Sequence, residues 1–335
     1  MKTIRVGVIG LGVGEQHART YQAHPECMVV ALCDLSEEKL SYIQPFFPEA
    51  ILTKNAEDII ENADIDIISI ASYDDTHFSQ VIQSLESGKH VFVEKPLCQT
   101  LEEATHIKKI WVSRKKNQKI DCNLILREAP LYKWLRDSLK KGEFGDIYAI
   151  DGEYLYGRLH KITQEWRSKV ENYSVMEGGG IHMIDLMLWL TGDRPVSVIS
   201  AGNRICSNNT PFKYNDFVTS IMEFENGMIG RITANFGCVH RHQHIIRIYG
   251  TKATFVYDDI GPRIYTSRNP DESPVWIQEN PLPASKGERI PSFISAILNK
   301  KDISDEVQTI IDGISICTAS DRSIQTQKRE LIHYI

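Results

Sequence analysis

A short apolar segment followed by closely spaced glycines constrains the fold of this chain more than any other feature. Residues 4–9 are mostly aliphatic, and Gly10, Gly12 and Gly14 follow before a helix-forming stretch. A strand, a glycine turn and a helix in this order are typical of a dinucleotide-binding βαβ unit. The next apolar segment ends at Asp34. A carboxylate there accepts hydrogen bonds from both ribose hydroxyls and repels a 2′-phosphate, which favours NAD over NADP.

The glycines have distinct expected roles. Gly10 permits the tight turn, and Gly12 lets the backbone approach a pyrophosphate held at the helix N-terminus. The third glycine comes one place earlier than in the pattern GxGxxG, because Glu15 occupies the usual position. A purely structural glycine turn is the alternative, and the acid at the end of the second strand argues against it.

The first third of the chain alternates short apolar segments with longer amphipathic ones. Near-continuous apolar runs belong to parallel strands that are covered on both faces. We expect strands at residues 4–9, 28–33, 65–70, 90–93 and 120–122, and helices at residues 15–24, 37–46, 56–62, 76–87 and 101–115. Thr100 and Glu103 have capping-box spacing, which supports the last helix start. The pattern predicts an α/β fold class, with an N-terminal doubly wound parallel sheet (a Rossmann fold) over residues 1–122.

Beyond residue 122 the pattern changes to mostly strands. We expect helices at residues 130–141, 290–298 and 305–324, a helix start in the glycine run 178–180, and strands at residues 146–156, 195–204, 216–224, 227–236, 243–249 and 253–257. The Asn226-Gly227 corner predicts a hairpin, because this pair accepts positive φ. Residues 268–286, rich in Pro and Ser, predict an irregular loop. Residues 123–335 therefore form the expected α+β domain for substrate binding and oligomerisation, with a large, open, mostly antiparallel sheet.

Composition excludes several classes of protein. The net charge of −6 and the absence of a dense basic run argue against a nucleic-acid partner. The densest run, at residues 114–116, falls where a helix is expected to end. The sequence contains no run of about 18 apolar residues, so we predict no membrane-spanning helix. The seven cysteines show no CxxC spacing, and the N-terminus has no signal-peptide pattern. We therefore expect a cytoplasmic protein.

A Lys-Pro step follows the expected strand at residues 90–93. Proline supplies no N–H to a strand ladder, so Lys95-Pro96 predicts the end of that strand. At the carboxyl edge of a parallel sheet, Lys95 would project towards a ligand. The alternative is a lysine that only caps a strand edge.

With these residues in view, the chain resembles the Gfo/Idh/MocA family of oxidoreductases. The resemblance covers essentially the whole chain and rests on the segments GLGVGEQHA, Thr76-His77, GKHVFVEKPL, residues 123–130 and GGGIHMIDLMLWLTG. It implies an NAD(H)-dependent enzyme, with NADP less favoured, that moves a hydride to or from a secondary carbinol or ketone of a sugar, inositol or sugar-nucleotide.

The resemblance also implies roles for two residues. Lys95 matches the lysine that polarises the substrate oxygen, and His182 matches the general acid/base. Imidazole suits this role because it titrates near the operating pH. The expected cofactor contacts are Gly10, Gly12, Val13, Gly14, Asp34, Ser72, His77, Glu94, Lys95 and Asn123. The expected substrate contacts are Lys95, Arg127, Tyr154, Trp166, Arg167, His182 and Asp185.

One position departs from the resemblance. Many relatives carry an aspartate four residues before the histidine, and this chain has Gly178 there. Asp185 lies on roughly the same helical face as His182 and either orients the imidazole or pairs with a basic group. The glycine run 178–180 is expected to let substrate and nicotinamide approach the backbone. The missing acid also leaves open an NAD(H)-binding sensor or partner protein without turnover.

Three histidines need a separate interpretation. His240, His242 and His244 share one face if the segment is a strand, which suggests metal ligands on spacing alone. No nearby Cys or acid completes a set, so a polar sheet face or subunit contact is the favoured interpretation. We expect a homodimer or homotetramer through the second domain's sheet. A further enzyme alternative uses NAD as a transient redox aid in elimination or glycoside cleavage.

Overall fold

The computed structural model describes residues 3–114 and 118–335, and the predictions that fall on residues 1–2 and 115–117 lie outside them. The chain divides into two compact units. The first contains Met1–Ile125 and Ala284–Ile311, and the second contains Leu126–Pro283 and Asp312–Ile335. Within the described ranges, no helix is both long and apolar enough to cross a membrane.

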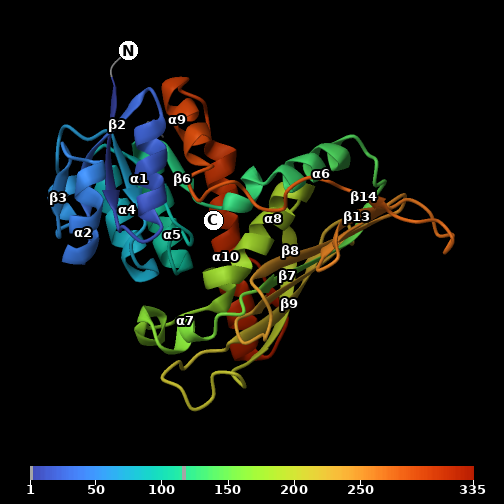
Figure 1. The fold of residues 1–335 in the computed structure, drawn as a ribbon. Coiled ribbons are helices and arrows are strands. Elements are labelled where there is room, and N and C mark those ends of the chain that lie inside the picture. Colours follow the sequence, from blue (N-terminus) through green and yellow to red (C-terminus); the bar gives the residue numbers. More distant parts are fainter. Residues whose placement is uncertain (1–2, 115–117) are drawn as a thin grey trace. The chain divides into compact units, whose positions relative to one another are not determined.

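The first unit is built on a six-stranded sheet in the order β3-β2-β1-β4-β5-β6, with every pairing parallel. The strands are β1 (Ile4–Ile9), β2 (Cys27–Cys33), β3 (Ile51–Thr53), β4 (Ile67–Ile70), β5 (His90–Val93) and β6 (Ile120–Cys122). The helices between them are α1 (Gly14–Ala23), α2 (Glu37–Ile43), α3 (Glu57–Ile60), α4 (His77–Glu86) and α5 (Leu101–Ser113). Figure 1 shows these strands and helices in blue to cyan. This is the doubly wound fold that the sequence predicts.

Two local predictions are confirmed in this unit. The Thr100 side chain accepts a hydrogen bond from the Glu103 backbone and Glu103 returns one, which completes the capping box of α5. The apolar strands are buried along nearly their whole length, because helices cover both faces. The sequence analysis missed β3, whose three half-exposed residues lie at the sheet edge.

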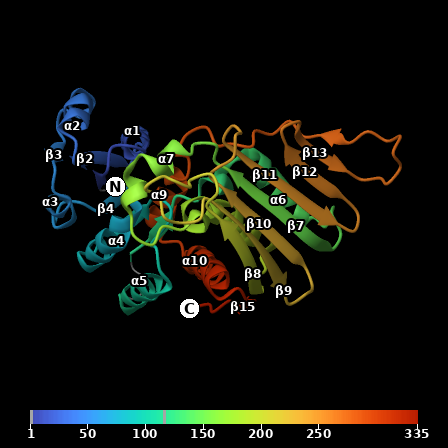
Figure 2. The same cartoon turned by 90° about the horizontal axis from the view of Figure 1, so that it is seen from below.

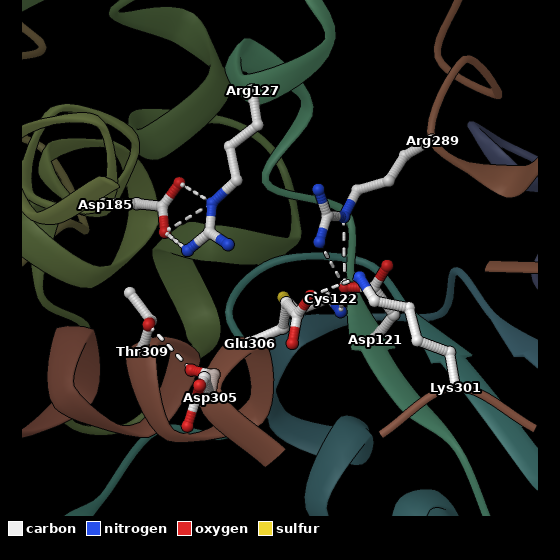
Figure 3. A network of polar contacts seen from close by, with 9 residues as sticks. All are labelled: Asp121, Cys122, Arg127, Asp185, Arg289, Lys301, Asp305, Glu306 and Thr309. Atoms are coloured by element: carbon white, nitrogen blue, oxygen red, sulfur yellow. Dashed lines mark hydrogen bonds and ion pairs between the residues drawn. The ribbon is translucent and has the colours of Figure 1, made fainter. Parts of the chain in front are cut away.

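Residues 284–311 pack on the first unit, although the sequence-based division assigned them to the second domain. The physical reason is helix α9 (Ile290–Leu298), which places Ile290, Phe293 and Ile294 in the same apolar core as β1 and β2. At the start of α9, Arg289 pairs with Asp121 at the edge strand β6, with Nε and Nη2 at 3.0 and 2.7 Å from Oδ1. Figure 3 shows this buried ion pair.

The second unit contains a nine-stranded sheet in the order β14-β13-β12-β11-β7-β10-β9-β8-β15. Only β7 and β10 pair in parallel, so the sheet is mostly antiparallel, as predicted. The strands are β7 (Ile147–Leu155), β8 (Pro195–Asn203), β9 (Phe217–Phe224), β10 (Ile229–Asn235), β11 (Gln243–Gly250), β12 (Thr254–Asp258), β13 (Gly261–Tyr265), β14 (Val275–Trp276) and β15 (Glu330–Leu331). Figure 2 shows the central strands side by side.

Helices pack on one face of this sheet. Helix α6 (Pro130–Lys140) contacts α8 (Ile181–Thr191), and α8 lies against β7 and β10. The second half of α10 (Ser304–Thr326) joins β8 and β9 through Ser320, whose hydroxyl is 3.0 Å from that of Ser200 and 2.8 Å from that of Ser220.

Some strands of this unit were not predicted. The sequence analysis missed β13 and β15, and it interpreted residues 268–286 as loop throughout, whereas β14 lies inside that range. Strands of two residues have too little periodicity to be recognised. The Asn226-Gly227 hairpin is confirmed, with Gly227 at a φ of 85° between β9 and β10.

Candidate functional site

The glycine turn after β1 has room for a ligand at one glycine and none at another. Gly10 has a φ of 87°, and a Cβ there would overlap the Ala71 carbonyl. At Gly12 a Cβ would meet nothing within 4 Å. A side chain at position 10 would therefore disturb the fold, whereas the backbone of Gly12 borders open space, as an approaching pyrophosphate requires.

Asp34 stands at the end of β2 and fixes the glycine turn. Its carboxylate accepts hydrogen bonds from the Leu11 and Ser36 backbone N–H groups at 2.6 and 2.9 Å. Lys39 pairs with the same carboxylate at 3.1 Å. The order of the strands, the open Gly12 and this acid fit a dinucleotide whose ribose lies at the end of β2.

The two glycines provide a matched test of the turn. We expect Gly12→Val to raise the dissociation constant of NADH at least tenfold with an unchanged melting temperature, because only the space for the ligand is filled. Gly10→Ala is expected to lower the melting temperature, because its strained φ disturbs the turn itself. Fluorescence titration and thermal melts measure both effects. Wild-type affinity in Gly12→Val would contradict the placement.

Glu94, directly after β5, is held as a carboxylate by buried partners. Its Oε1 accepts from Asn123 Nδ2 at 2.6 Å and lies 3.3 Å from His17 Nε2. Burial acts to raise the pKa of Glu94, but the hydrogen bonds from His17 and Asn123 and the charge of Lys95 outweigh it and lower the pKa to about 2. The contact of Glu94 with His17 was not predicted, because it joins side chains of two different elements.

Lys95 leaves the carboxyl edge of the same sheet that carries the glycine turn, and its peptide bond to Pro96 is cis. His77 holds the backbone beside it. The His77 ring is fully buried, with Nδ1 2.6 Å from the Pro96 carbonyl and Nε2 3.3 Å from the Ser72 carbonyl. The contact of this ring with the cofactor stays a prediction; in this position its two nitrogens face the carbonyls of two loops. The Ser72 hydroxyl donates to Gln80 at 2.7 Å.

His182, in the second unit, lies in the first turn of α8. The helix continues from a π-helical segment, Met176–Gly180, which contains the glycine run. The His182 side chain is buried, with 8% exposed, and its ring stacks on Tyr154 of β7 at a centroid separation of 5.8 Å. An aromatic neighbour on one face leaves the ring few orientations, which suits a group that must present one nitrogen.

The protein's own aromatic rings occupy the space beside the glycine run. A Cβ at Gly178 would overlap the Tyr173 hydroxyl, and one at Gly179 would overlap the Tyr154 ring. The sequence analysis expected substrate and nicotinamide to approach these glycines. At Gly178 and Gly179, tyrosine side chains are instead in close contact, because a helix packed this tightly on tyrosines has no space for Cβ atoms.

Asp185 pairs with Arg127, which decides between its two interpretations in favour of a basic partner. Arg127 Nε lies 2.9 Å from Asp185 Oδ2, and Nη2 bonds to Oδ1. Both side chains are buried, with 4% and 3% exposed, and Figure 3 shows the fork-like arrangement. Their contact with substrate stays a prediction. In the structure each side chain provides the partner that the other buried charge needs.

The other predicted substrate residues differ in exposure. Tyr154 is buried beneath its neighbours, and this burial raises its pKa well above the usual value. Trp166 and Arg167 are half-buried on a short helical turn, where the guanidinium lies 4.2 Å from the indole centroid. These two keep surface that a sugar ring or a polar group can contact.

The three histidines of residues 240–244 do not share one environment. His240 bonds to Asp259 at 3.0 Å, and that hydrogen bond raises its pKa. His242 donates from Nδ1 to the Leu155 carbonyl at 3.0 Å, whereas His244 is buried. No set of three or more His, Cys, Asp or Glu side chains suited to a metal ion occurs in residues 3–114 and 118–335.

Asp321 of α10 anchors the start of the π-helical segment. Its carboxylate accepts from the Ser174 hydroxyl at 3.0 Å, and Ser174 accepts from the Met176 N–H at 3.2 Å. Burial raises the pKa of Asp321 to about 6, although the Ser174 bond opposes the shift.

This shift predicts how stability depends on pH. A raised carboxyl pKa gives stability that is complete below the unfolded pKa, near 4, and lost as pH rises through about 6. We expect Asp321→Asn to raise the free energy of unfolding at pH 8 by about 3 kcal/mol and to flatten its dependence between these two pH values. Urea denaturation across this range measures it; an unchanged slope would contradict the prediction.

Comparisons with known proteins agree with this geometry. The model of an oxidoreductase family with an NAD-binding Rossmann fold, GFO/IDH/MocA, matches residues 4–120, and the model of the GFO/IDH/MocA C-terminal domain matches residues 132–256. The myo-inositol 2-dehydrogenase of Thermotoga maritima is 23% identical over 266 residues, or 77% of this chain and 76% of that protein.

Two further relatives are informative. A glycosyl hydrolase family 109 protein of Porphyromonas gingivalis is 25% identical over 248 residues, or 68% of this chain and 52% of that protein. Levoglucosan dehydrogenase in complex with NADH and L-sorbose has the same fold, with a TM-score of 0.86 at 20% identity over 99% of both chains. The chain therefore belongs to the GFO/IDH/MocA family and is an NAD-dependent oxidoreductase whose first unit is the family's NAD-binding Rossmann domain.

Proposed function

We propose that this enzyme interconverts a secondary alcohol and a ketone on a sugar, inositol or sugar-nucleotide. The observation that carries the proposal is the position of Lys95, at the carboxyl edge of the sheet whose first strand ends in the glycine turn. Relatives named for inositol and levoglucosan support a polyhydroxylated ring as the substrate class.

The proposed chemistry divides the work between two side chains. NAD held at the glycine turn and Asp34 would supply the hydride acceptor for oxidation of the carbinol, and NADH would supply the donor for reduction. The Lys95 ammonium donates a hydrogen bond to the substrate oxygen and stabilises the developing alkoxide. The His182 imidazole takes the hydroxyl proton during oxidation and returns it during reduction. The half-buried Trp166 and Arg167 are proposed to contact the ring and its substituents.

A dehydrogenation screen tests the proposal. The purified protein is incubated with NAD and with free sugars, inositols and nucleotide sugars, and absorbance at the nicotinamide band is followed. We expect turnover of at least one polyhydroxylated ring, with NAD preferred over NADP because of Asp34. Tight NADH binding without absorbance change for any compound would instead support the sensor or partner protein.

The glycosyl hydrolase relative favours a second candidate. In glycoside cleavage the cofactor is used transiently, so no net NADH accumulates. Release of p-nitrophenol from p-nitrophenyl glycosides, with NAD present and with NAD removed, distinguishes this reaction from dehydrogenation. Cleavage that depends on NAD would establish the second candidate.

We also propose that the sheet of the second unit pairs with a second copy of the chain. Its strands leave Ile199, Ile221 and Ile229 about 40% exposed, at 44%, 45% and 39%. These aliphatic side chains on neighbouring strands make an apolar area that a second sheet would cover. Light scattering is expected to give a dimer or tetramer, and Ile221→Glu is expected to reduce its mass. A monomeric wild type would contradict this proposal. The expectation of a cytoplasmic location stays a prediction that this measurement does not address.

A further inference from the structure

His182 lies in a cluster with two other imidazoles of the second unit. The His182 and His244 rings have centroids 5.8 Å apart at an angle of 80°, and the His244 and His242 rings are 4.9 Å apart at 76°. One of the three histidines considered as metal ligands, His244, therefore lies beside the proposed general acid/base, and a second, His242, lies beside His244. The third, His240, bonds to Asp259 instead.

The strand register explains why these rings meet. His244 of β11 is the direct cross-strand partner of Tyr154 of β7, so their side chains share the face on which α8 packs. The Tyr154 ring lies 5.8, 5.3 and 5.1 Å from the rings of His182, His244 and His242. Tyr154 is thus the common packing partner of the three imidazoles, and its contacts hold them as one group.

The last ring of the series is the most exposed. His182 and His244 are buried, with 8% and 7% exposed, whereas His242 is half-buried. A carbonyl oxygen can only accept, so the 3.0 Å contact of His242 with Leu155 requires the hydrogen on Nδ1. In neutral His242 the basic nitrogen is therefore Nε2. The series begins at the proposed acid/base and ends at a side chain that solvent reaches.

We propose that His244 and His242 relay the proton between His182 and solvent. This inference rests on the proposed role of His182. In the oxidation, the C–H bond breaks with its electron pair, which passes as hydride to NAD⁺, and the O–H proton moves to His182. His182 passes a proton to His244, His244 to His242, and His242 to water, directly or through one bridging water molecule at each step. Reduction of the ketone runs the same transfers backwards.

Like charges in the cluster oppose one another. Imidazolium rings this close repel, so a proton on one ring disfavours a second proton on its neighbour. The other titratable or charged side chains around it come from five places. They are Tyr154 of β7, Tyr156, Arg158, Arg167 and Tyr173 after β7, Glu177 and Asp185 of the helical segment, Arg241 before β11, and Tyr257 and Asp259 at the end of β12. Asp185 is neutralised by Arg127, and Asp259 by His240 and Arg241.

The first test follows the rings themselves and needs no substrate. Protein labelled with ¹³C-histidine is saturated with NADH, and the ring signals are titrated by NMR. We expect His244→Gln to move the His182 titration to higher pH by at least half a unit, because a competing proton site is lost. His240→Gln, on the same segment but outside the cluster, is expected to leave it unchanged. If the titration midpoint of the His182 signals is the same in His244→Gln as in wild type and His240→Gln, the relay is overturned.

The second test uses turnover of the best substrate found in the dehydrogenation screen. In dilute buffer we expect His244→Gln and His242→Gln to lower kcat about tenfold, to increase the solvent deuterium isotope effect and to recover when free imidazole is added. If kcat falls in both variants and free imidazole does not restore it, these residues act only through packing and the relay is overturned. NADH affinity within twofold of wild type shows that each variant is folded.

The failure of this inference and that of the proposed function give different results. Full activity in His182→Gln would remove the proposed acid/base and the relay together. The relay alone would be wrong if His182→Gln is inactive while His244→Gln and His242→Gln keep wild-type kcat and isotope effects.

Discussion

His182→Gln is expected to lower kcat about a thousandfold and to leave NADH affinity within twofold of wild type. Glutamine keeps the size and polarity of the buried side chain next to Tyr154 but exchanges no proton at neutral pH, so the general acid/base contribution is lost. Lys95→Met is expected to lower kcat about a hundredfold or more, because the alkoxide loses its cationic donor. Initial rates at the nicotinamide band and fluorescence titration with NADH measure the two effects.

The control for these variants is His240→Gln. His240 lies on the segment before β11, bonded to Asp259, and outside the cluster around His182. It is expected to keep wild-type kcat and NADH affinity. If His182→Gln and Lys95→Met both keep wild-type rates on the true substrate, the roles proposed for them are wrong.

Arg127→Met is expected to lower the free energy of unfolding by about 3–5 kcal/mol. The substitution leaves the Asp185 carboxylate buried on α8 without its cationic partner, and both side chains are nearly inaccessible. The double variant Arg127→Met with Asp185→Leu is expected to recover most of this loss, because an apolar pair can replace a buried ion pair. Urea unfolding followed by tryptophan fluorescence measures the difference.

An exposed ion pair of the same unit provides the comparison. Arg231 is 45% exposed and pairs with Asp151 at 3.0 Å, so Arg231→Met is expected to cost less than about 1 kcal/mol. If Arg127→Met and Arg231→Met lower the free energy of unfolding equally, leaving the buried Asp185 without its partner costs no more than losing an exposed ion pair. A rise in KM with unchanged stability in Arg127→Met would instead support the substrate contact that the sequence suggests.

The parallel sheet was predictable because its pattern is local. β1, β5 and β6 have the predicted bounds, and β1 and β5 are short, mostly apolar runs that end before a glycine turn and a Glu-Lys-Pro step. The hairpin at Asn226-Gly227 was predictable for the same reason. The packing of α9 against the first unit was not, because it depends on contacts such as Arg289 with Asp121, 168 residues apart in sequence.

The candidate site was predictable in its residue types and not in its partners. Glycine spacing, Asp34 and the Lys-Pro step are visible in sequence, and the structure places them at the ends of β1, β2 and β5. The pairing of Arg127 with Asp185, the burial of His77 and the contact of His244 with His182 depend on side chains from different elements. No spacing along the chain encodes them.

The tight fit of Gly178 against Tyr173 has a consequence for engineering. An aspartate could not simply be grafted at position 178, because its first carbon would collide with the tyrosine hydroxyl. Such a graft requires a smaller residue at 173 as well, and Tyr173 also packs edge-on against Phe212, at 5.7 Å. Gly178→Asp alone is therefore expected to lower the melting temperature, and a smaller residue at position 173 is expected to recover part of that loss.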